Sequence, residues 1–166
     1  MSSNIIDTSA LPSDKPLSPE RKRIISEILE LYCCRPNEKY YLNFENDSKF
    51  QDPICDARNL TEIKAQFNAM PKAFSNSVTK SCKVVKNEKD TIHFDLVQEY
   101  TFSGLGYTKT MESTTVLDFN QSNKIINFED RWNHSASWKD HSLLVNVQNM
   151  FRRFNAVALP HFISTN

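Results

Sequence analysis

The sequence is poor in glycine, and this shortage excludes several kinds of functional site. Only two glycines, Gly104 and Gly106, occur among 166 residues, where average usage would supply about 12. The glycine-rich loops of P-loop nucleotide sites, dinucleotide-binding folds and esterase nucleophile turns need more glycine than this. We therefore exclude all three kinds of site.

Net charge and long apolar runs are also missing. Twenty basic and twenty acidic residues give a formal net charge of zero, so the electrostatic footprint of a nucleic-acid-binding protein is absent. No run approaches the roughly 20 apolar residues of a membrane span, and the N-terminus lacks the basic and apolar regions of a secretory signal. We expect a cytoplasmic protein, with nuclear access left open, that has no nucleic-acid partner and no transmembrane segment.

The four cysteines do not form a metal-binding pattern. Zinc sites of the common kind require a Cys-x-x-Cys pair or a His-x-x-x-His partner. The sequence offers neither to its four cysteines, Cys33, Cys34, Cys55 and Cys82. We expect free thiols, no metal site and no cofactor.

The N-terminal part of the chain contains an arm followed by helices. Residues 1–17 carry prolines and polar residues without apolar periodicity, which predicts a disordered arm outside the fold. Ser18 and Pro19 are typical of a helix start, and apolar residues then recur at helical spacing as far as Tyr32. A second helix is predicted after Asn37, with an aromatic stripe formed by Tyr40, Tyr41 and Phe44.

A short edge strand and a third helix follow. Phe50, Asp52 and Ile54 alternate so that they would share one face of a strand, and Pro53 restricts that strand to a sheet edge. Asn59, with Glu62 three residues later, predicts a capped helix that ends near Pro71.

From residue 77 the apolar period changes from that of a helix to that of a strand. Four strands are predicted, joined by short turns and therefore antiparallel; they span residues 77–86, 91–103, 106–119 and 124–133. Asp140 and Pro160 bound a last amphipathic helix. We expect an α+β domain over residues 18–135, with the C-terminal helix in 136–166 packed against it.

The turns between the strands predict which residues lie opposite each other. A two-residue turn at Gly104 and Leu105 pairs Tyr100 with Lys109, and extending the register to the last strand pairs Ser113 with Asp130. Asp130 then lies on the apolar face, where an unpaired polar group costs roughly 2 to 7 kcal/mol. Its partners would come from the nearest polar side chains, which are Gln98, Ser113 and Tyr100.

The order of elements resembles the nuclear transport factor 2-like superfamily, and in particular its SnoaL-like members, the polyketide cyclases and ketosteroid isomerases. The segment from Phe50 to Ile54, which contains Asp52-Pro53, and the helix that follows Asn59 are similar to the corresponding segments of those proteins. The resemblance implies a cone-shaped fold in which N-terminal helices pack on a curved antiparallel sheet. It also implies that Asp52 is the proton-shuttling base.

The rest of the isomerase machinery does not correspond. The positions of the two oxyanion donors of those enzymes fall near Ile28 and Thr115 in this sequence. An enolate would then lack the electrostatic stabilisation that usually contributes most to such chemistry. Tyr32, one helical turn beyond Ile28, is the candidate replacement donor.

Each candidate has a functional and a structural interpretation. Asp52 is either a base or a carboxylate bonded to nearby backbone N–H groups. Asp130 is either a second acid that shares a proton with Asp52 or a paired structural carboxylate. His93 and Asp95 lie at alternate positions on the more polar face, which favours a solvated or dimer-facing surface over a dyad. His134 is either at the cone mouth or in an ordinary loop.

The aromatic residues and the C-terminal helix also allow two interpretations. The aromatic side chains, Trp138 among them, either form plain core or line a pocket for a flat ligand. The C-terminal helix, which contains Arg152 and Arg153, either covers the sheet or binds a membrane or a partner.

These observations favour a domain that binds a small apolar ligand in its cone. Asp52 and Asp130 are the candidate catalytic residues of an isomerase, cyclase or dehydratase. The predicted pocket residues are Tyr32, Tyr41, Gln98, Tyr100, Met111, Ser113, Trp132 and His134. The alternative is a non-catalytic module that forms a homodimer through the sheet or binds a protein partner.

Overall fold

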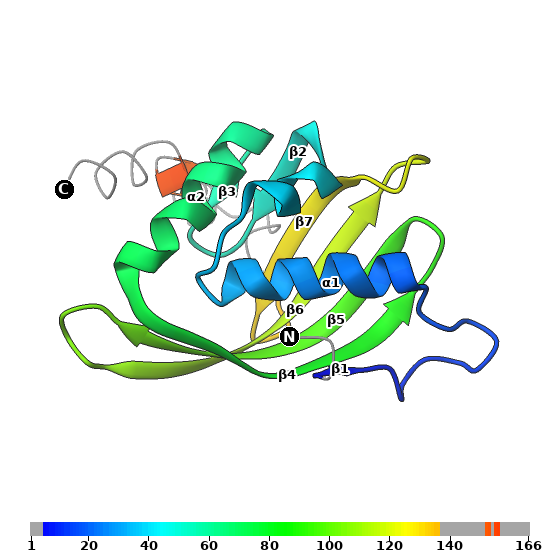
Figure 1. Ribbon diagram of the computed structural model, residues 1–166, viewed down its shortest axis with the longest axis horizontal. Helices are drawn as coiled ribbons and strands as arrows, with labels where there is room; N and C mark the ends of the chain where they lie inside the picture. The colour runs from blue at the N-terminus through cyan, green and yellow to red at the C-terminus, as the bar shows by residue number, and fades with distance from the viewer. Residues whose placement is uncertain (1–4, 137–151, 154, 157–166) are drawn as a thin grey trace.

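A computed structural model describes residues 5–136, 152–153 and 155–156. Figure 1 shows one curved sheet with the helices on its inner face. The strand order in the described residues is β1-β4-β5-β6-β7-β2-β3. The helices are α1 (Pro19–Tyr32), η2 (Glu38–Asn43), a short 3-10 helix, and α2 (Leu60–Ala73). The strands are β1 (Ile6–Asp7), β2 (Phe44–Gln51), β3 (Asp56–Ala57), β4 (Phe74–Asn87), β5 (Thr91–Phe102), β6 (Thr108–Phe119) and β7 (Ile125–Trp132).

The sheet is mixed, although a fully antiparallel one was expected. The four consecutive strands β4 to β7 pair in antiparallel fashion, which confirms that part of the prediction. The two outer pairings, β1 with β4 and β2 with β7, are parallel. Parallel neighbours need a long connection, and here the connections contain the helices or the whole meander.

The predicted helix starts are confirmed. The Ser18 hydroxyl accepts a hydrogen bond from the backbone N–H of Arg21 at 3.2 Å. The Asn59 side chain accepts one from the N–H of Glu62 at 3.0 Å, and its amide donates to the Glu62 carboxylate at 3.1 Å. Helix α2 continues past Pro71 to Ala73, because the N–H of Phe74 still reaches the Met70 carbonyl and closes the last turn.

The predicted second helix and edge strand are displaced. Only η2 forms after Asn37, and Phe44 already begins strand β2. Strand β2 ends at Gln51, so Phe50, Asp52 and Ile54 do not share one strand face. Ile54 is 54% exposed while Asp52 is 8% exposed, because the chain turns at Pro53.

The register between β5 and β6 agrees with the prediction, with Tyr100 opposite Lys109. The register between β6 and β7 differs by two residues, since Asp130 lies opposite Thr115 and Ser113 lies opposite Trp132. One residue of this difference arises at the turn, where Phe119 pairs with Ile125 and not with Lys124, and the other arises at an irregularity between Asp118 and Phe119. A shift of two residues leaves each side chain on its expected face, so Asp130 still points inward.

The N-terminal segment is part of the fold in the described residues, unlike the expected disordered arm. Ile6 pairs with Cys82 of β4, and its side chain is only 8% exposed and contacts the core. A single buried residue within a polar segment gives no periodicity, so the pattern could not predict it. The predicted C-terminal helix falls mostly outside the described residues, as does Trp138; Arg152, Arg153, Asn155 and Ala156 are described and are helical.

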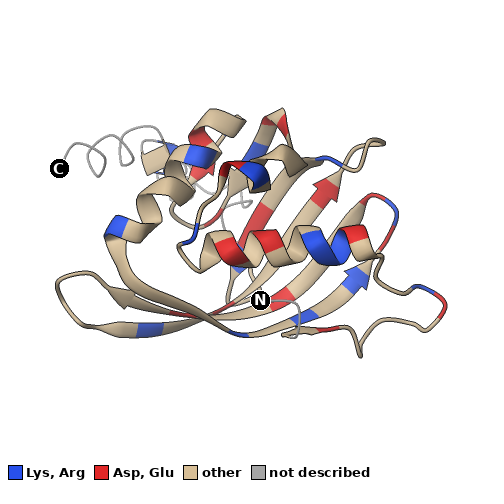
Figure 2. Ribbon diagram, viewed as in Figure 1, with Lys and Arg blue, Asp and Glu red and all other residues tan. Residues whose placement is uncertain are grey.

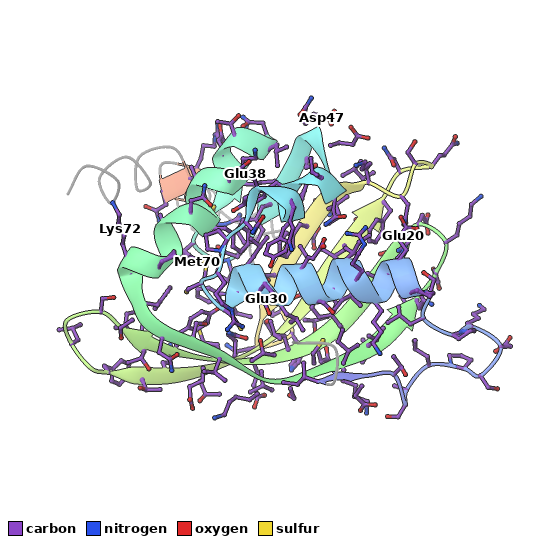
Figure 3. The ribbon with its side chains drawn as sticks, viewed as in Figure 1. Glu20, Glu30, Glu38, Asp47, Met70 and Lys72 are labelled. Carbon is purple, nitrogen blue, oxygen red and sulfur yellow. The ribbon has the colours of Figure 1, made fainter. Side chains whose placement is uncertain are left out.

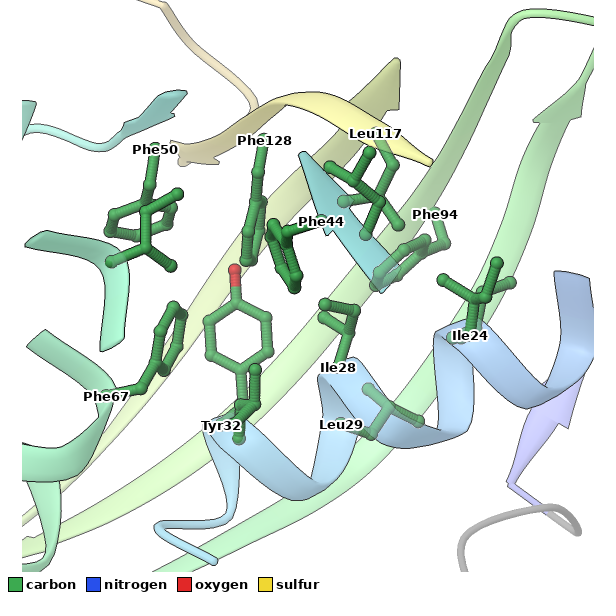
Figure 4. Close-up of a cluster of buried hydrophobic side chains, with 14 of the residues drawn as sticks. Ile24, Ile28, Leu29, Tyr32, Phe44, Phe50, Phe67, Phe94, Leu117 and Phe128 are labelled. Carbon is green, nitrogen blue, oxygen red and sulfur yellow. The ribbon is translucent and has the colours of Figure 1, made fainter. Parts of the chain in front are cut away.

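The core lies between α1, α2 and the inner face of the sheet (Figure 4). Phe67 of α2 stacks on Phe128 of β7 with ring centroids 5.9 Å apart, and Phe50 meets the same ring at 4.7 Å. Tyr32 at the end of α1 packs edge-on against Phe67 and Phe128. This aromatic cluster joins the helices to β2 and β7 and forms one wall of the site described below.

The surface carries both signs of charge, interspersed along α1 and over the strands (Figure 2). This distribution agrees with the zero net charge. None of the helices in the described part of the chain is long and apolar enough to cross a membrane.

The buried position of Ile6 predicts that β1 contributes to stability. Truncating a partly peripheral buried isoleucine, Ile6→Ala, should lower the free energy of unfolding by about 1 to 3 kcal/mol, measured by urea denaturation. Thr8→Ala, which changes an exposed neighbour, is the matched control and should have little effect. Equal stability of the two variants would contradict a structural role for β1.

Candidate functional site

A cavity of about 320 Å³ opens between α2, the inner face of β5 to β7 and the turn that follows β2. Both predicted catalytic carboxylates, Asp52 and Asp130, line it. Six of the predicted pocket residues also line it: Tyr32, Gln98, Tyr100, Met111, Ser113 and Trp132.

Two predicted pocket residues do not line the cavity. Tyr41 is buried in the core, where its hydroxyl donates to the Asn68 side chain at 2.9 Å. His134 lies on the outer face of the sheet, with Nδ1 2.7 Å from the Thr114 hydroxyl and 3.6 Å from Asp95. Asn133 and His134 both have positive φ angles of 51° and 60°, so the chain turns away from the cavity after β7.

Sequence reasoning missed the contribution of α2 to the cavity. Phe67, Met70 and Phe74 line it, from α2 and the start of β4; Figure 3 labels Met70 on α2. The sequence places Phe67 and Met70 on one apolar helix face with Leu60 and Ile63, whereas Phe74 follows the helix. That pattern does not distinguish a residue that lines a cavity from one that fills a core.

The two carboxylates are brought together by the parallel pairing of β2 with β7. Gln51, the last residue of β2, lies opposite Glu129 of β7 in that pairing. The residues that follow these two in the sequence are Asp52 and Asp130. Asp52 and Asp130 are 8% and 6% exposed, and they come from segments 78 residues apart in the sequence.

A tight turn holds the Asp52 carboxylate. The backbone N–H groups of Ile54 and Cys55 donate to its Oδ1 at 2.7 and 2.6 Å, and its own N–H donates to the Cys55 carbonyl at 3.1 Å. The structural interpretation of Asp52 as a backbone-bonded carboxylate is thus confirmed, and the same bonds hold the group against the cavity. No donor among the described residues contacts Oδ2.

Asp130 is only partly satisfied. Its Oδ2 accepts a hydrogen bond from Trp132 Nε1 at 3.0 Å. Its Oδ1 is buried and no donor among the described residues reaches it with hydrogen-bond geometry, although the Ser113 and Tyr32 hydroxyls lie near enough to lower the pKa of Asp130. A buried acceptor without a donor costs about 1 to 3 kcal/mol, so the position of this oxygen lowers the stability of the folded protein.

The polar residues near the acids differ in what they can offer. Gln98 is fully engaged, because its amide donates to the Ser77 hydroxyl at 2.8 Å and its oxygen accepts from Thr79 at 2.8 Å. Tyr32 has a freer hydroxyl, 3.4 Å from that of Thr115. Burial, and then the charge of Asp130, raise the pKa of Tyr32 and of Tyr100. Both phenols therefore stay protonated and can donate.

Burial raises the pKa of both carboxyl groups. The pKa of Asp52 rises to about 7, mainly through burial and then through the charge of Asp130, against the lowering effects of the Ile54 and Cys55 amides and of Arg152. The pKa of Asp130 rises to about 6 through burial, against the lowering effects of Ser113, Trp132 and Tyr32. Between these values the pair holds about one proton, so one acid and one base face the same cavity.

The described residues contain no group of three or more His, Cys, Asp or Glu side chains that could hold a metal ion. The residues that line the cavity carry carboxyl, hydroxyl, indole, amide and thiol groups and the ammonium group of Lys109, all of which can donate or accept hydrogen bonds.

The raised pKa values predict that Asp130→Asn stabilises the protein. The folded state holds protons that the unfolded state, with carboxyl pKa values near 3.9, has already lost above about pH 4. Wild-type stability should therefore fall as the pH rises from about 4 to about 7. The free energy of unfolding of Asp130→Asn should exceed that of wild type by on the order of 2 kcal/mol at about pH 8. This difference should be smaller at about pH 4.

Urea denaturation across this pH range measures the effect. Asp47→Asn, which changes an exposed carboxylate on β2 (Figure 3), is the control and should leave the pH profile unchanged. A variant that is less stable than wild type at about pH 8 would show that Asp130 is well paired in the folded protein.

Comparison with protein-family models and with curated proteins finds no match to the sequence. Comparison with solved structures finds many matches. An NTF2-like protein from Anabaena variabilis superposes with a TM-score of 0.58 at 15% identity, over 68% of this chain and 86% of that one. A protein from Catenulispora acidiphila with a ketosteroid isomerase-like fold, in complex with trimethylamine, gives 0.56 at 14% identity, over 72% and 88%.

A third similar structure is Rv0760c from Mycobacterium tuberculosis in complex with estradiol-17β-hemisuccinate. It gives a TM-score of 0.52 at 18% identity, over 66% of this chain and 93% of that one. The order of helices and strands, the curved open sheet and these superpositions lead to one conclusion. The chain has the α+β cone fold of the NTF2-like proteins, the fold that the resemblance to SnoaL-like proteins implied.

Proposed function

We propose that this protein binds a small, mostly apolar ligand in the cavity and that Asp52 and Asp130 transfer protons to and from it. The observation that carries the proposal is the presence of two buried carboxyl groups beside one apolar cavity. Buried carboxyl groups with raised pKa values are costly to the fold and are frequent at functional sites. The cavity volume of about 320 Å³ lies within the usual range for small-molecule sites.

The cavity walls define the ligand's chemistry. Apolar side chains dominate them, including Phe67, Met70, Phe74, Leu96 and Phe102, so the body of the ligand is apolar. The unpaired Oδ1 of Asp130 calls for a hydroxyl or N–H group on the ligand. Two of the structurally similar proteins were solved with compounds that combine apolar carbon with a polar group, estradiol-17β-hemisuccinate and trimethylamine.

The proton transfer needs one acid and one base, which the pair supplies near neutral pH. The ionised carboxylate accepts a proton from a carbon or hydroxyl of the ligand, and the protonated partner donates its proton to an oxygen. The net charge of the pair is unchanged. General acid and base groups work best when their pKa values lie near the working pH. This chemistry fits an isomerase, a cyclase or a dehydratase.

The groups that stabilise a developing negative charge differ from those of the ketosteroid isomerases. Ile28 is fully buried in the core and cannot donate, and Thr115 is buried with its hydroxyl toward Tyr32. The protonated hydroxyls of Tyr32 and Tyr100 are two of the donors that line this cavity. Donors of this kind in a site shielded from water stabilise an oxyanion strongly.

Probe binding tests the proposal. Wild type should bind 2-naphthol, which has one hydroxyl donor, at least about tenfold more tightly than 2-methoxynaphthalene, which has none. A tenfold preference corresponds to about 1.4 kcal/mol. Fluorescence titration or calorimetry measures both affinities.

Asp130→Asn should abolish this preference. The new side chain would turn its oxygen toward Trp132 Nε1, which now donates to Oδ2, and would present N–H groups to the ligand's donor. Asp47→Asn is again the control. Failure of wild type to bind either probe, or equal affinity for both, would contradict the proposal.

The alternative function, a homodimer formed through the sheet, stays a prediction. The outer face carries Asp95, Thr114 and His134, joined by hydrogen bonds, and in Figure 1 the helices lie on the opposite face. Sedimentation velocity of the purified protein should give the mass of a dimer, and a monomer at all accessible concentrations would exclude it.

A further inference from the structure

The described helical residues near the C-terminus, Arg152, Arg153, Asn155 and Ala156, lie against the turn that holds Asp52. Arg152 is only 2% exposed, although a guanidinium group is costly to bury. Its Nε donates to the Asp52 carbonyl and its Nη2 donates to the Cys55 carbonyl at 2.9 Å. One side chain therefore joins both ends of the Asp52–Cys55 turn.

Neighbouring side chains extend this contact. Asn155 donates to the Ile54 carbonyl at 3.0 Å, and Arg153 donates to the Asp56 carbonyl at 3.1 Å. Arg153 also forms an ion pair with Glu62 at the start of α2. Gln66 of α2 donates to the carbonyls of Asn155 and Ala156 at 3.2 and 3.0 Å. The segment is thus fastened to both the turn and α2.

The turn is held from two sides. Its N–H groups, from Ile54 and Cys55, point to the Asp52 carboxylate, and its carbonyl groups accept from Arg152 and Asn155. Because a peptide unit is planar, the bond from Asn155 to the Ile54 carbonyl also fixes the direction of the Cys55 N–H. Arg152 holds the carbonyl groups at the two ends of the turn and so limits how far the residues between them can move. A movement of Arg152 and Asn155 would therefore move the turn whose N–H groups orient the carboxylate.

We propose that Arg152 is a positioning residue that fixes the Asp52 turn and so determines where the Asp52 carboxyl group meets the cavity. This inference rests on the proposed function and extends it to a residue 100 positions away in the sequence. Arg152 acts through the backbone carbonyls of the turn, and its positive charge is the cation that faces Asp52. The other titratable groups that face Asp52 are Asp130, Tyr32, Tyr100 and Cys55.

The charge of Arg152 has a definite electrostatic effect. It lowers the pKa of Asp52, against burial and against the charge of Asp130. Removing the charge while keeping a polar side chain should therefore raise the pKa of Asp52 further. Replacing Arg152 with another cationic residue should keep the pKa of Asp52 close to its wild-type value.

The experiment compares Arg152→Gln with Arg152→Lys, which differ in charge but are both polar. NMR titration of ¹³C-labelled aspartate carboxyl groups gives the pKa of Asp52 in the full chain without any ligand, and the Asp52→Asn and Asp130→Asn variants assign the signals. We expect the Gln variant to raise this pKa by about one unit and the Lys variant to stay close to wild type. Arg35→Gln, which changes an exposed ion pair with Glu30 on the far side of α1, is the control.

Amide hydrogen exchange in the same samples tests the positioning role. Both variants lose the guanidinium group that donates to two carbonyls of the turn. The amide protons of Ile54 and Cys55 should therefore exchange with solvent at least about tenfold faster, while those of β5 exchange at the wild-type rate. Identical pKa values in the Gln and Lys variants, or unchanged exchange at the turn, would overturn the inference. Because neither readout needs a ligand, failure of the naphthol experiment and failure of this one are distinguishable.

Discussion

The parallel pairing of β2 with β7 is the constraint on which the site depends. It sets Phe50 opposite Phe128 and Gln51 opposite Glu129, and the two acids follow. The same pairing brings the Phe50 and Phe128 rings to 4.7 Å, so one register creates both the aromatic wall and the acid pair. Changing this register by one residue would turn the aromatic side chains to the other face and separate the carboxylates.

Burying two carboxyl groups lowers the stability of the fold, and the groups around them offset part of this loss. The amides of Ile54 and Cys55, the indole of Trp132 and the charge of Arg152 each favour an ionised carboxylate. Burial still raises both pKa values, and the charge of Asp130 raises that of Asp52 further. Such a balance is expected where a group must exchange protons near neutral pH, because a fully paired carboxylate would hold its charge too firmly to act as an acid.

The parts of the fold that follow from local rules could be predicted from the sequence. The helix starts at Ser18 and Asn59 and the register across Gly104 depend on residues within one turn of each other. The inward direction of Asp130 also followed, because strand alternation survives a two-residue shift. Local patterns carry no information on the partner of a distant strand, so the β2–β7 pairing, strand β1 and the irregularity at Asp118 were not predictable.

The candidate site likewise contains residues that the sequence predicted and residues whose role depends on contacts between distant parts of the chain. Eight of the ten predicted residues line the cavity. Tyr41 and His134 do not, since Tyr41 is buried in the core and His134 forms a left-handed turn together with Asn133. Arg152 was visible only as a basic residue on a predicted amphipathic helix. Its contact with Asp52 joins residues 100 positions apart, and no spacing rule extends over that distance.

The short strand β1 has a consequence for how separate copies of this protein meet. It pairs with only Cys82 and Lys83 of the 14-residue strand β4, so most of that strand's outer edge has no neighbour in the described sheet. An exposed edge of this length is a template for sheet extension and aggregation. Three register irregularities in β4 and the lysines at positions 80, 83 and 86 are the kinds of feature that oppose such pairing. The edge that carries the N-terminal strand thus resists aggregation through the shape and charge of β4 itself.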